Sequence, residues 1–173
     1  MKYEIYLAGG CFWGIEKYLK LIKGVTYTEV GYANGKMEHP TYEDVCRGDT
    51  EFVETVKVEY DSSIISLSYL LELYFDSIDP TSVNQQGGDI GTQYRTGIYY
   101  TDASDASVLT IIEESIKHVA NSYDAPIVTE VLPLSCFYTA ETYHQNYLDK
   151  NPSGYCHIGP ELFAKAKKAV MSQ

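Results

Sequence analysis

Hydrophobic positions along the chain alternate between a period of two and a period near 3.6. The first pattern predicts five strands, at residues 3–7, 25–33, 53–60, 97–100 and 127–132. The second predicts helices starting at Phe12, at 67–74, at 109–119 and at 160–168, with a short helix inside 136–151. We therefore expect a single α+β domain, residues 1–173: a two-layer sandwich with a mixed sheet, a ferredoxin-like (split βαβ) core and long irregular loops.

One stretch has no regular period. Residues 79–95 read DPTSVNQQGGDIGTQYR, a long run of glycine, proline and polar side chains. A loop of this length in a small domain is usually either functional or disordered. Its specific polar side chains favour a function.

Charge and composition exclude several classes of protein. The formal net charge is −11 at pH 7, which disfavours binding to nucleic acid or to an anionic membrane. No apolar run is long enough to span a bilayer. The start, MKYEIYLAGGC, has a short apolar stretch that contains Glu4, so it is a poor signal peptide. We expect a cytoplasmic monomer without nucleic-acid or membrane partners.

The four cysteines are Cys11, Cys46, Cys136 and Cys156, and no pair has CxxC spacing. We therefore expect no metal site. Without a secretion signal, reduced or catalytic thiols are favoured over structural disulfides. Burial statistics predict that Cys46 and Cys136 are buried structural thiols.

Cys11 lies in LAGGCFWGIE, between a predicted strand and a predicted helix. Three interpretations compete: a buried structural thiol, a lipid-attachment site and a nucleophile. The apolar segment before Cys11 is too short for lipid attachment. A helix N-terminus stabilises a thiolate through its dipole and its free N–H groups, so we expect an exposed, ionised sulfur. Phe12 and Trp13 fit an apolar pocket for a methyl or thioether group, or ordinary core.

The strand at 53–60 offers a candidate acid. Alternation places Glu54, Val56, Val58 and Tyr60 on one face. If the valine face is buried, Glu54 is buried too, its pKa rises, and it can act as a general acid near neutral pH. In the alternative, Glu54 lies in water at the edge of the strand.

Seven segments carry a more specific pattern. They are GCFWGIE (10–16), GYANG (31–35), HPTYEDVC (39–46), VETVKVEYD (53–61), DPTSVNQQGGDIGTQYR (79–95), FYTAETYHQNYL (137–148) and NPSGYCH (151–157). Together, and in this order, they closely resemble the methionine sulfoxide reductase A family, the peptide-methionine (S)-S-oxide reductases. The resemblance covers nearly the whole chain.

The resemblance implies an enzyme that reduces the S epimer of methionine sulfoxide, in oxidised proteins or as the free amino acid. It implies that Cys11 is the nucleophile and that Phe12 and Trp13 hold the substrate methyl group. Glu54 matches the acid that protonates the sulfoxide oxygen.

Further roles follow from the same resemblance. Tyr42 and Tyr94 match two phenols that bind the sulfoxide oxygen, and Asp89 matches a residue lining the site. Cys156 matches the resolving cysteine, which converts a sulfenic acid on Cys11 into a Cys11–Cys156 disulfide that thioredoxin reduces. No cofactor is implied.

Some features depart from the family pattern or leave alternatives open. Glu51 stands close to the candidate acid, where many members have an uncharged residue, and its charge is expected to alter the pKa of Glu54. Cys156 lies in a Pro-Ser-Gly segment that is expected to be mobile. His144, with Glu141 three residues earlier, suggests a cysteine hydrolase with Cys11, although a structural hydrogen-bonded pair is simpler. A noncatalytic module that binds methionine-rich peptides is the third alternative.

Overall fold

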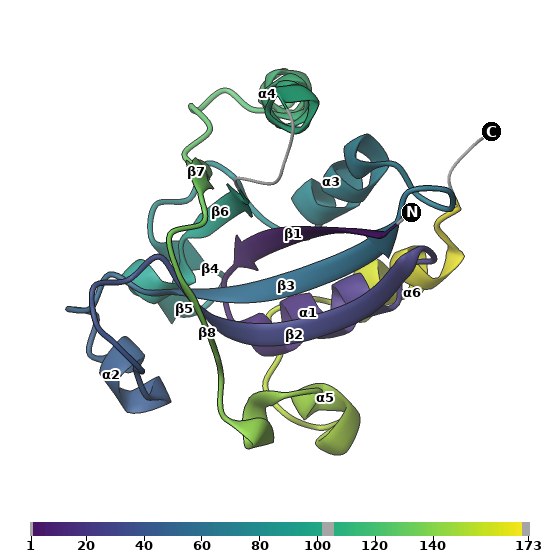
Figure 1. Cartoon of the computed structure of the whole chain (residues 1–173). Coiled ribbons are helices and arrows are strands. Elements are labelled where there is room, and N and C mark those ends of the chain that lie inside the picture. Colours follow the sequence, from purple (N-terminus) through teal and green to yellow (C-terminus); the bar gives the residue numbers. More distant parts are fainter. Residues whose placement is uncertain (1, 102–105, 171–173) are drawn as a thin grey trace.

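The computed structural model describes residues 2–101 and 106–170, which form a six-stranded sheet with helices packed against it (Figure 1). The strands lie in the order β7-β6-β1-β3-β2-β8, and neighbours are antiparallel except for β6 and β7. Their bounds are β1 Lys2–Gly9, β2 Val25–Ala33, β3 Val53–Asp61, β6 Thr96–Tyr100, β7 Glu130–Pro133 and β8 Phe137–Thr139. A separate two-stranded ribbon pairs β4 (Gln85–Gln86) with β5 (Asp89–Ile90).

The helices follow the predicted periodicity. They are α1 Phe12–Lys20, α2 Tyr42–Cys46, α3 Leu67–Asp76, α4 Ala106–Ala120, α5 Tyr147–Lys150 and α6 Pro160–Lys168, with 3₁₀ turns η1 Thr92–Tyr94 and η2 Thr142–His144. Helix α2 was not predicted, although its start carries a capping box in which Thr41 and Asp44 exchange backbone and side-chain hydrogen bonds.

The predicted α+β class with a mixed sheet is confirmed. Helix α1 connects β1 to β2, and α3 lies in the connection from β3 to β6, so each of these two helices joins strands that are not neighbours in the sheet. The predicted strand at 127–132 is partly wrong, because pairing begins only at Glu130. The N–H of Val128 instead donates to the carbonyl oxygen of Pro80, at 2.8 Å.

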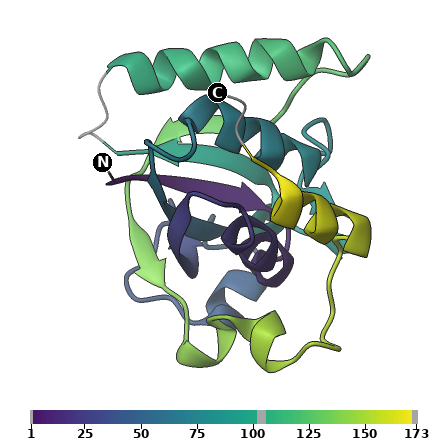
Figure 2. The same ribbon diagram turned by 90° about the vertical axis from the view of Figure 1, so that its right-hand side faces the viewer.

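The main core lies between one face of the sheet and the helices. Buried apolar side chains of β1 and β3 pack there against α1 and α3. Two tyrosines complete this layer: the Tyr18 hydroxyl donates to Leu73 O at 2.6 Å, and the Tyr74 hydroxyl donates to Ala8 O at 2.5 Å. In Figure 2, α4 lies along the top of the molecule, and α6 lies beside α1.

A smaller apolar cluster covers the opposite face of the sheet. It consists of Tyr6, Ala8, Ala33, Val53 and Tyr99, with Leu134 and Phe137 packed against it. Because both faces are covered near the end of β1, the turn that follows β1 starts from a rigid, water-excluded part of the fold.

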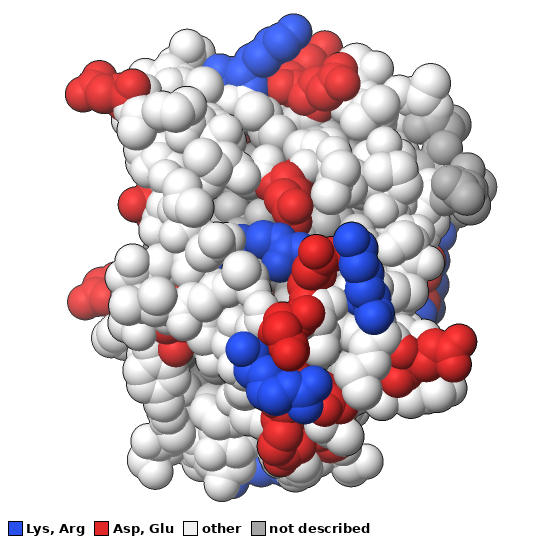
Figure 3. All heavy atoms as spheres, turned by 90° about the vertical axis from the view of Figure 1, so that its left-hand side faces the viewer, with Lys and Arg blue, Asp and Glu red and all other residues white. Residues whose placement is uncertain are grey.

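Charged side chains are interleaved on the face that carries α2. Figure 3 shows basic side chains lying beside acidic ones on this face. Lys36 pairs with Glu51, and Arg47 pairs with Asp44 and Asp49. Each pair has at least one exposed partner, and surface pairs of this kind contribute little to stability. Among the helices of the described residues, none has the length and hydrophobicity needed to cross a bilayer.

Candidate active site

The turn between β1 and α1 places Cys11 directly before the first helical residue, as predicted. Gly10 has a φ of +86°, and a Cβ at this position would lie 2.7 Å from the side chain of Gln86, so only glycine fits. The backbone N–H of Trp13 donates to the Cys11 sulfur. The helix N-terminus therefore faces the sulfur and offers it a hydrogen bond.

The predicted exposure and ionisation of Cys11 are wrong for the substrate-free protein. Only 7% of the residue is exposed. Burial raises the pKa of the thiol far above its usual value, the charge on Glu54 raises it further, and the Trp13 N–H lowers it only in part. Desolvating a charge costs several kcal/mol, whereas a helix N-terminus returns about 0.3–1 kcal/mol. The thiol therefore keeps its proton at neutral pH in the substrate-free protein.

Glu54 is buried on the core face of β3, as the strand alternation predicted, with 1% of the residue exposed. Its Oε1 accepts a hydrogen bond from the backbone N–H of Phe12 at 3.2 Å, whereas Oε2 has no partner in the described structure. Burial raises the pKa of Glu54 from 4.5 to about 8, with a smaller contribution from the charge of Asp89. At neutral pH the carboxyl group therefore carries a proton.

The predicted effect of Glu51 on this carboxyl group is wrong. The Glu51 carboxylate is exposed and pairs with Lys36 at 3.0 Å. The acidic side chain that acts on Glu54 is Asp89. Glu51 is close to Glu54 in sequence, but its carboxylate lies in solvent beside Lys36.

The phenols of Tyr42 and Tyr94 both lie within the electrostatic influence of Glu54. Tyr42 begins α2 and Tyr94 ends η1, and both are half-buried. Burial raises the pKa of each phenol far above its usual value, and the charge on Glu54 raises both further. Both phenols therefore remain hydrogen-bond donors over the whole physiological pH range.

Aromatic side chains pack around the turn that carries Cys11. Phe12 is buried, and Trp13 stacks on Tyr147 with ring centroids 3.7 Å apart. The Trp13 indole N–H donates to Nδ1 of His144 at 2.9 Å. The ring centroid of His144 lies 5.2 Å from that of Phe12 and 4.5 Å from that of Tyr42. His144 therefore connects Phe12 and Trp13 to Tyr42.

This contact decides the protonation of His144. Burial lowers the pKa of its imidazole, so the ring is neutral, and Nδ1 accepts from Trp13. In a neutral imidazole the other nitrogen, Nε2, then carries the hydrogen, which leaves no lone pair to accept a proton from Cys11. The expected hydrogen-bonded pair with Glu141 forms through the backbone, where the His144 N–H donates to Glu141 O at 2.9 Å. The Glu141 carboxylate accepts from the Tyr32 hydroxyl and the Tyr42 N–H.

Asp89 and Cys156 belong to two segments that meet near the turn before α1. Asp89, in β5, accepts a hydrogen bond from the Tyr155 hydroxyl at 3.1 Å. Cys156 packs over the first turn of α1, with its sulfur 3.0 Å from the point where a Cβ on Gly14 would stand. Its sulfur also accepts from the N–H of Ile158 at 3.4 Å. The Pro-Ser-Gly segment was expected to be mobile. Cys156, at its end, is instead held next to α1, the helix that follows Cys11.

Cys46 and Cys136 are less buried than predicted. Cys46 is exposed, so its assignment as a buried thiol is wrong; α2 is a short surface helix whose buried residue is Val45. The Cys46 and Tyr42 side chains share a hydrogen bond. Cys136 is half-buried and donates to the Gly35 carbonyl at 3.7 Å.

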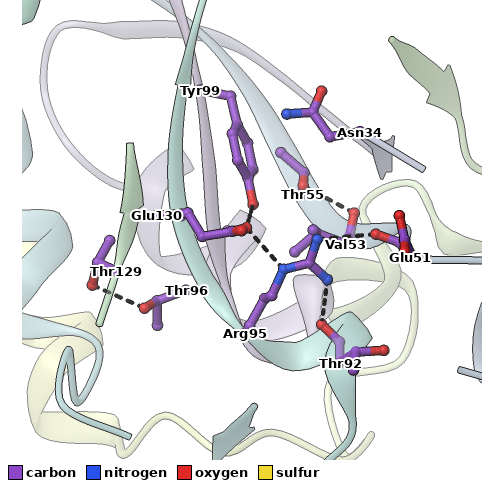
Figure 4. Close-up of polar contacts among 12 residues, drawn as sticks. Asn34, Glu51, Val53, Thr55, Thr92, Arg95, Thr96, Tyr99, Thr129 and Glu130 are labelled. Carbon is purple, nitrogen blue, oxygen red and sulfur yellow. Dashed lines mark hydrogen bonds and ion pairs between the residues drawn. The ribbon is translucent and has the colours of Figure 1, made fainter. Parts of the chain in front are cut away.

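Arg95 connects the segment that leads to Glu54 with the turn that contains Tyr94 (Figure 4). Its guanidinium donates to the carbonyl oxygens of Glu51 at 3.0 Å and Thr92 at 2.8 Å. It also donates to Glu130 at 2.8 Å, which in turn accepts from Tyr99 at 2.7 Å. Glu51 leads into the strand of Glu54, and Thr92 begins the turn that ends at Tyr94.

Arg95→Lys is expected to lower kcat for the reaction at this site by about tenfold while the protein stays folded, because a single ammonium group cannot make three divergent hydrogen bonds. Steady-state kinetics and thermal unfolding would be measured together. Arg47→Lys is the matched control, since Arg47 makes only exposed ion pairs. An unchanged kcat in Arg95→Lys would contradict this positioning role.

A protonated acid, two phenol donors and a thiol at a helix N-terminus together define a thiol-dependent enzyme with acid assistance. Comparison with known proteins identifies the family. Residues 3–173 match the family described as peptide methionine sulfoxide reductase. The peptide methionine sulfoxide reductase MsrA of Lachnoclostridium phytofermentans is 59% identical over 169 residues, which is 98% of this chain and 100% of that protein.

Comparison with solved structures indicates the same family. Reduced Mxr1 from Saccharomyces cerevisiae is 40% identical, with a TM-score of 0.83, and the match covers 90% of this chain and 88% of that one. Mxr1 in complex with Trx2 matches at 26% identity and a TM-score of 0.58, covering 84% of each chain. The chain belongs to the peptide methionine sulfoxide reductase family, which confirms the resemblance drawn from the seven segments.

Proposed function

We propose that Cys11 reduces the S epimer of methionine sulfoxide with a proton supplied by Glu54. The observation that carries this proposal is the state of Glu54: fully buried, protonated at neutral pH, and bonded through Oε1 to the residue after Cys11. The Oε2 atom has no partner in the described structure and is free to meet a substrate oxygen. A buried polar atom without a partner is costly in a protein that does not use it.

The pocket fits each part of a sulfoxide. Phe12 and Trp13 provide aromatic faces for the substrate methyl group. The oxygen faces Glu54 and the phenols of Tyr42 and Tyr94, which donate hydrogen bonds as negative charge develops on it. Asp89 lines the mouth of the site, where its side chain is 15% exposed.

The chemistry of the first step balances without an added oxidant or reductant. Glu54 protonates the sulfoxide oxygen, which makes the sulfoxide sulfur electrophilic, and the Cys11 sulfur attacks it. The oxygen then passes to Cys11, methionine leaves, and Cys11 becomes a sulfenic acid. The proton lost by the thiol returns Glu54 to its neutral form. Methionine sulfoxide is reduced by two electrons and Cys11 is oxidised by two.

Cys156 completes the cycle in this proposal. Its thiol condenses with the sulfenic acid to form the Cys11–Cys156 disulfide and releases water. The position of Cys156 over the first turn of α1 supports this role. Thioredoxin then reduces the disulfide by thiol–disulfide exchange. The yeast relative Mxr1, whose structure with Trx2 is similar to this chain, supports thioredoxin as the partner.

We place this activity in one catalytic domain, acting as a monomer in the cytoplasm on oxidised proteins or free methionine sulfoxide. The single main core and the acidic composition support this assignment. A cysteine hydrolase using His144 is disfavoured, because the nitrogen that faces Trp13 already accepts a hydrogen bond.

The distinguishing experiment uses the resolved S and R epimers of methionine sulfoxide with dithiothreitol. We expect methionine to form from the S epimer with one dithiothreitol oxidised per methionine, and only background turnover of the R epimer. Hydrolysis of an ester or amide without reductant would indicate a hydrolase. Binding of the sulfoxide without any product would indicate a noncatalytic module.

A further inference from the structure

His157, the residue after Cys156, is a buried imidazole with unused hydrogen-bonding capacity. Its side chain is 5% exposed, and the backbone of Gly9 offers the ring a hydrogen bond, which leaves at least one ring nitrogen without a partner among the described residues. The cost of leaving a buried polar atom unpaired is about 1–3 kcal/mol. None of the steps above uses this residue.

The ring packs against the turn that carries Cys11, on the same side of α1 as the Cys156 sulfur. Nε2 lies 3.2 Å from the point where a Cβ on Gly10 would stand, and Gly10 directly precedes Cys11. Cε1 lies 3.5 Å from the corresponding point on Gly14, and the Cys156 sulfur lies 3.0 Å from that same point. The absence of side chains at Gly10 and Gly14 thus leaves room for the imidazole against the residue before Cys11, and for the Cys156 sulfur beside it on the first turn of α1.

The groups around the imidazole are few. Nδ1 lies 3.9 Å from Oδ2 of Asp89, and the carbonyl oxygen of Gly9 also faces the ring. Tyr155 donates to the same Asp89 oxygen. Burial lowers the pKa of His157, although the Asp89 charge acts in the opposite direction, so the ring is neutral at pH 7 and can accept a proton.

The condensation step needs such a group. Burial raises the pKa of the Cys156 thiol, so this thiol is protonated and weakly nucleophilic. The hydroxyl group on the Cys11 sulfenic acid is a poor leaving group unless it is protonated. A single base can take the proton from the Cys156 thiol and give it to the departing hydroxyl group of the Cys11 sulfenic acid.

We propose that His157 is the acid–base group of disulfide formation. It takes the proton from the Cys156 thiol as that sulfur attacks the Cys11 sulfur. The new S–S bond forms as the S–O bond breaks, and the imidazolium gives its proton to the departing hydroxide, which leaves as water. No net proton or electron is gained or lost. This proposal rests on the proposed roles of Cys11 and Cys156.

Single-turnover kinetics separate this step from the first. Reduced enzyme is mixed with the S sulfoxide in the absence of reductant, and methionine release and thiol loss are followed separately. In His157→Gln we expect methionine release within about twofold of wild type and disulfide formation about 10²-fold slower. The sulfenic acid should then accumulate and be trapped by dimedone. His118→Gln, at an exposed position on α4, is the matched control.

The pH profile and chemical rescue test the role further. In wild type, disulfide formation should slow as pH falls through the pKa of His157, and His157→Gln should lack this decline. Added imidazole should accelerate disulfide formation in His157→Ala. Wild-type disulfide formation in His157→Gln would overturn the proposal. Equal slowing of methionine release without rescue by imidazole would also overturn it, since that indicates a structural role. Failure of wild type to release methionine would instead reject the proposed function itself.

Discussion

Cys11→Ser is expected to reduce sulfoxide turnover by at least about 10⁴-fold, because an alcohol oxygen cannot accept the substrate oxygen as a thiol does. The fold should be retained. Cys11 occupies the N-cap of α1, where its sulfur accepts from the Trp13 N–H, and a serine oxygen is a preferred acceptor at this position, worth about 1 kcal/mol. Methionine formation and thermal unfolding of the variant would be measured side by side.

Cys136→Ser is the matched control, because it exchanges a half-buried thiol outside the pocket. It should keep full activity. Turnover in Cys11→Ser within tenfold of wild type would reject Cys11 as the nucleophile. A large fall in the melting temperature would mean that lost activity reflects unfolding.

Glu54→Gln is expected to slow the reductase step by about 10²–10⁴-fold, the usual contribution of a general acid. Glutamine has the same shape, and its oxygen can still accept from the Phe12 N–H, so the start of α1 should remain in place. It cannot transfer a proton to the sulfoxide. Rapid-quench measurement of methionine release reports this step directly.

The pH dependence gives Glu54→Gln a second signature. The wild-type rate should fall as pH rises through about 8, where Glu54 loses its proton. Because the folded pKa lies above the value of 4.5, this group stabilises the fold below pH 4.5, and that contribution is lost as pH rises towards 8. The variant should lack both trends. A wild-type rate, or an unchanged decline near pH 8, would remove Glu54 from the mechanism.

Local patterns in the sequence were enough to predict the helices other than α2, the longer strands and the burial of Glu54. Strand alternation placed Glu54 with Val56 and Val58, and the apolar neighbours decided which face is buried. The position of Cys11 before α1 followed from the two glycines and the helical period that begins at Phe12. These features depend on residues close together in the chain.

Features that depend on distant contacts could not be predicted. The bond between Trp13 and His144 joins residues 131 positions apart, and Arg95 reaches a carbonyl 44 positions away. The burial of Cys11 likewise arises from segments that cover the turn, and it reversed the expected ionisation of the thiol. No local pattern in the sequence singles out His157, whose position is defined by packing against Gly10 and Gly14.

Thiol mapping after one turnover tests the central claim most directly. Fully reduced protein is mixed with one equivalent of the S sulfoxide without reductant, quenched with an alkylating reagent and digested for mass spectrometry. We predict one methionine released per chain, a single disulfide joining Cys11 to Cys156, and alkylated Cys46 and Cys136. Methionine release with all four thiols still alkylated, or a disulfide that excludes Cys11, would contradict the account.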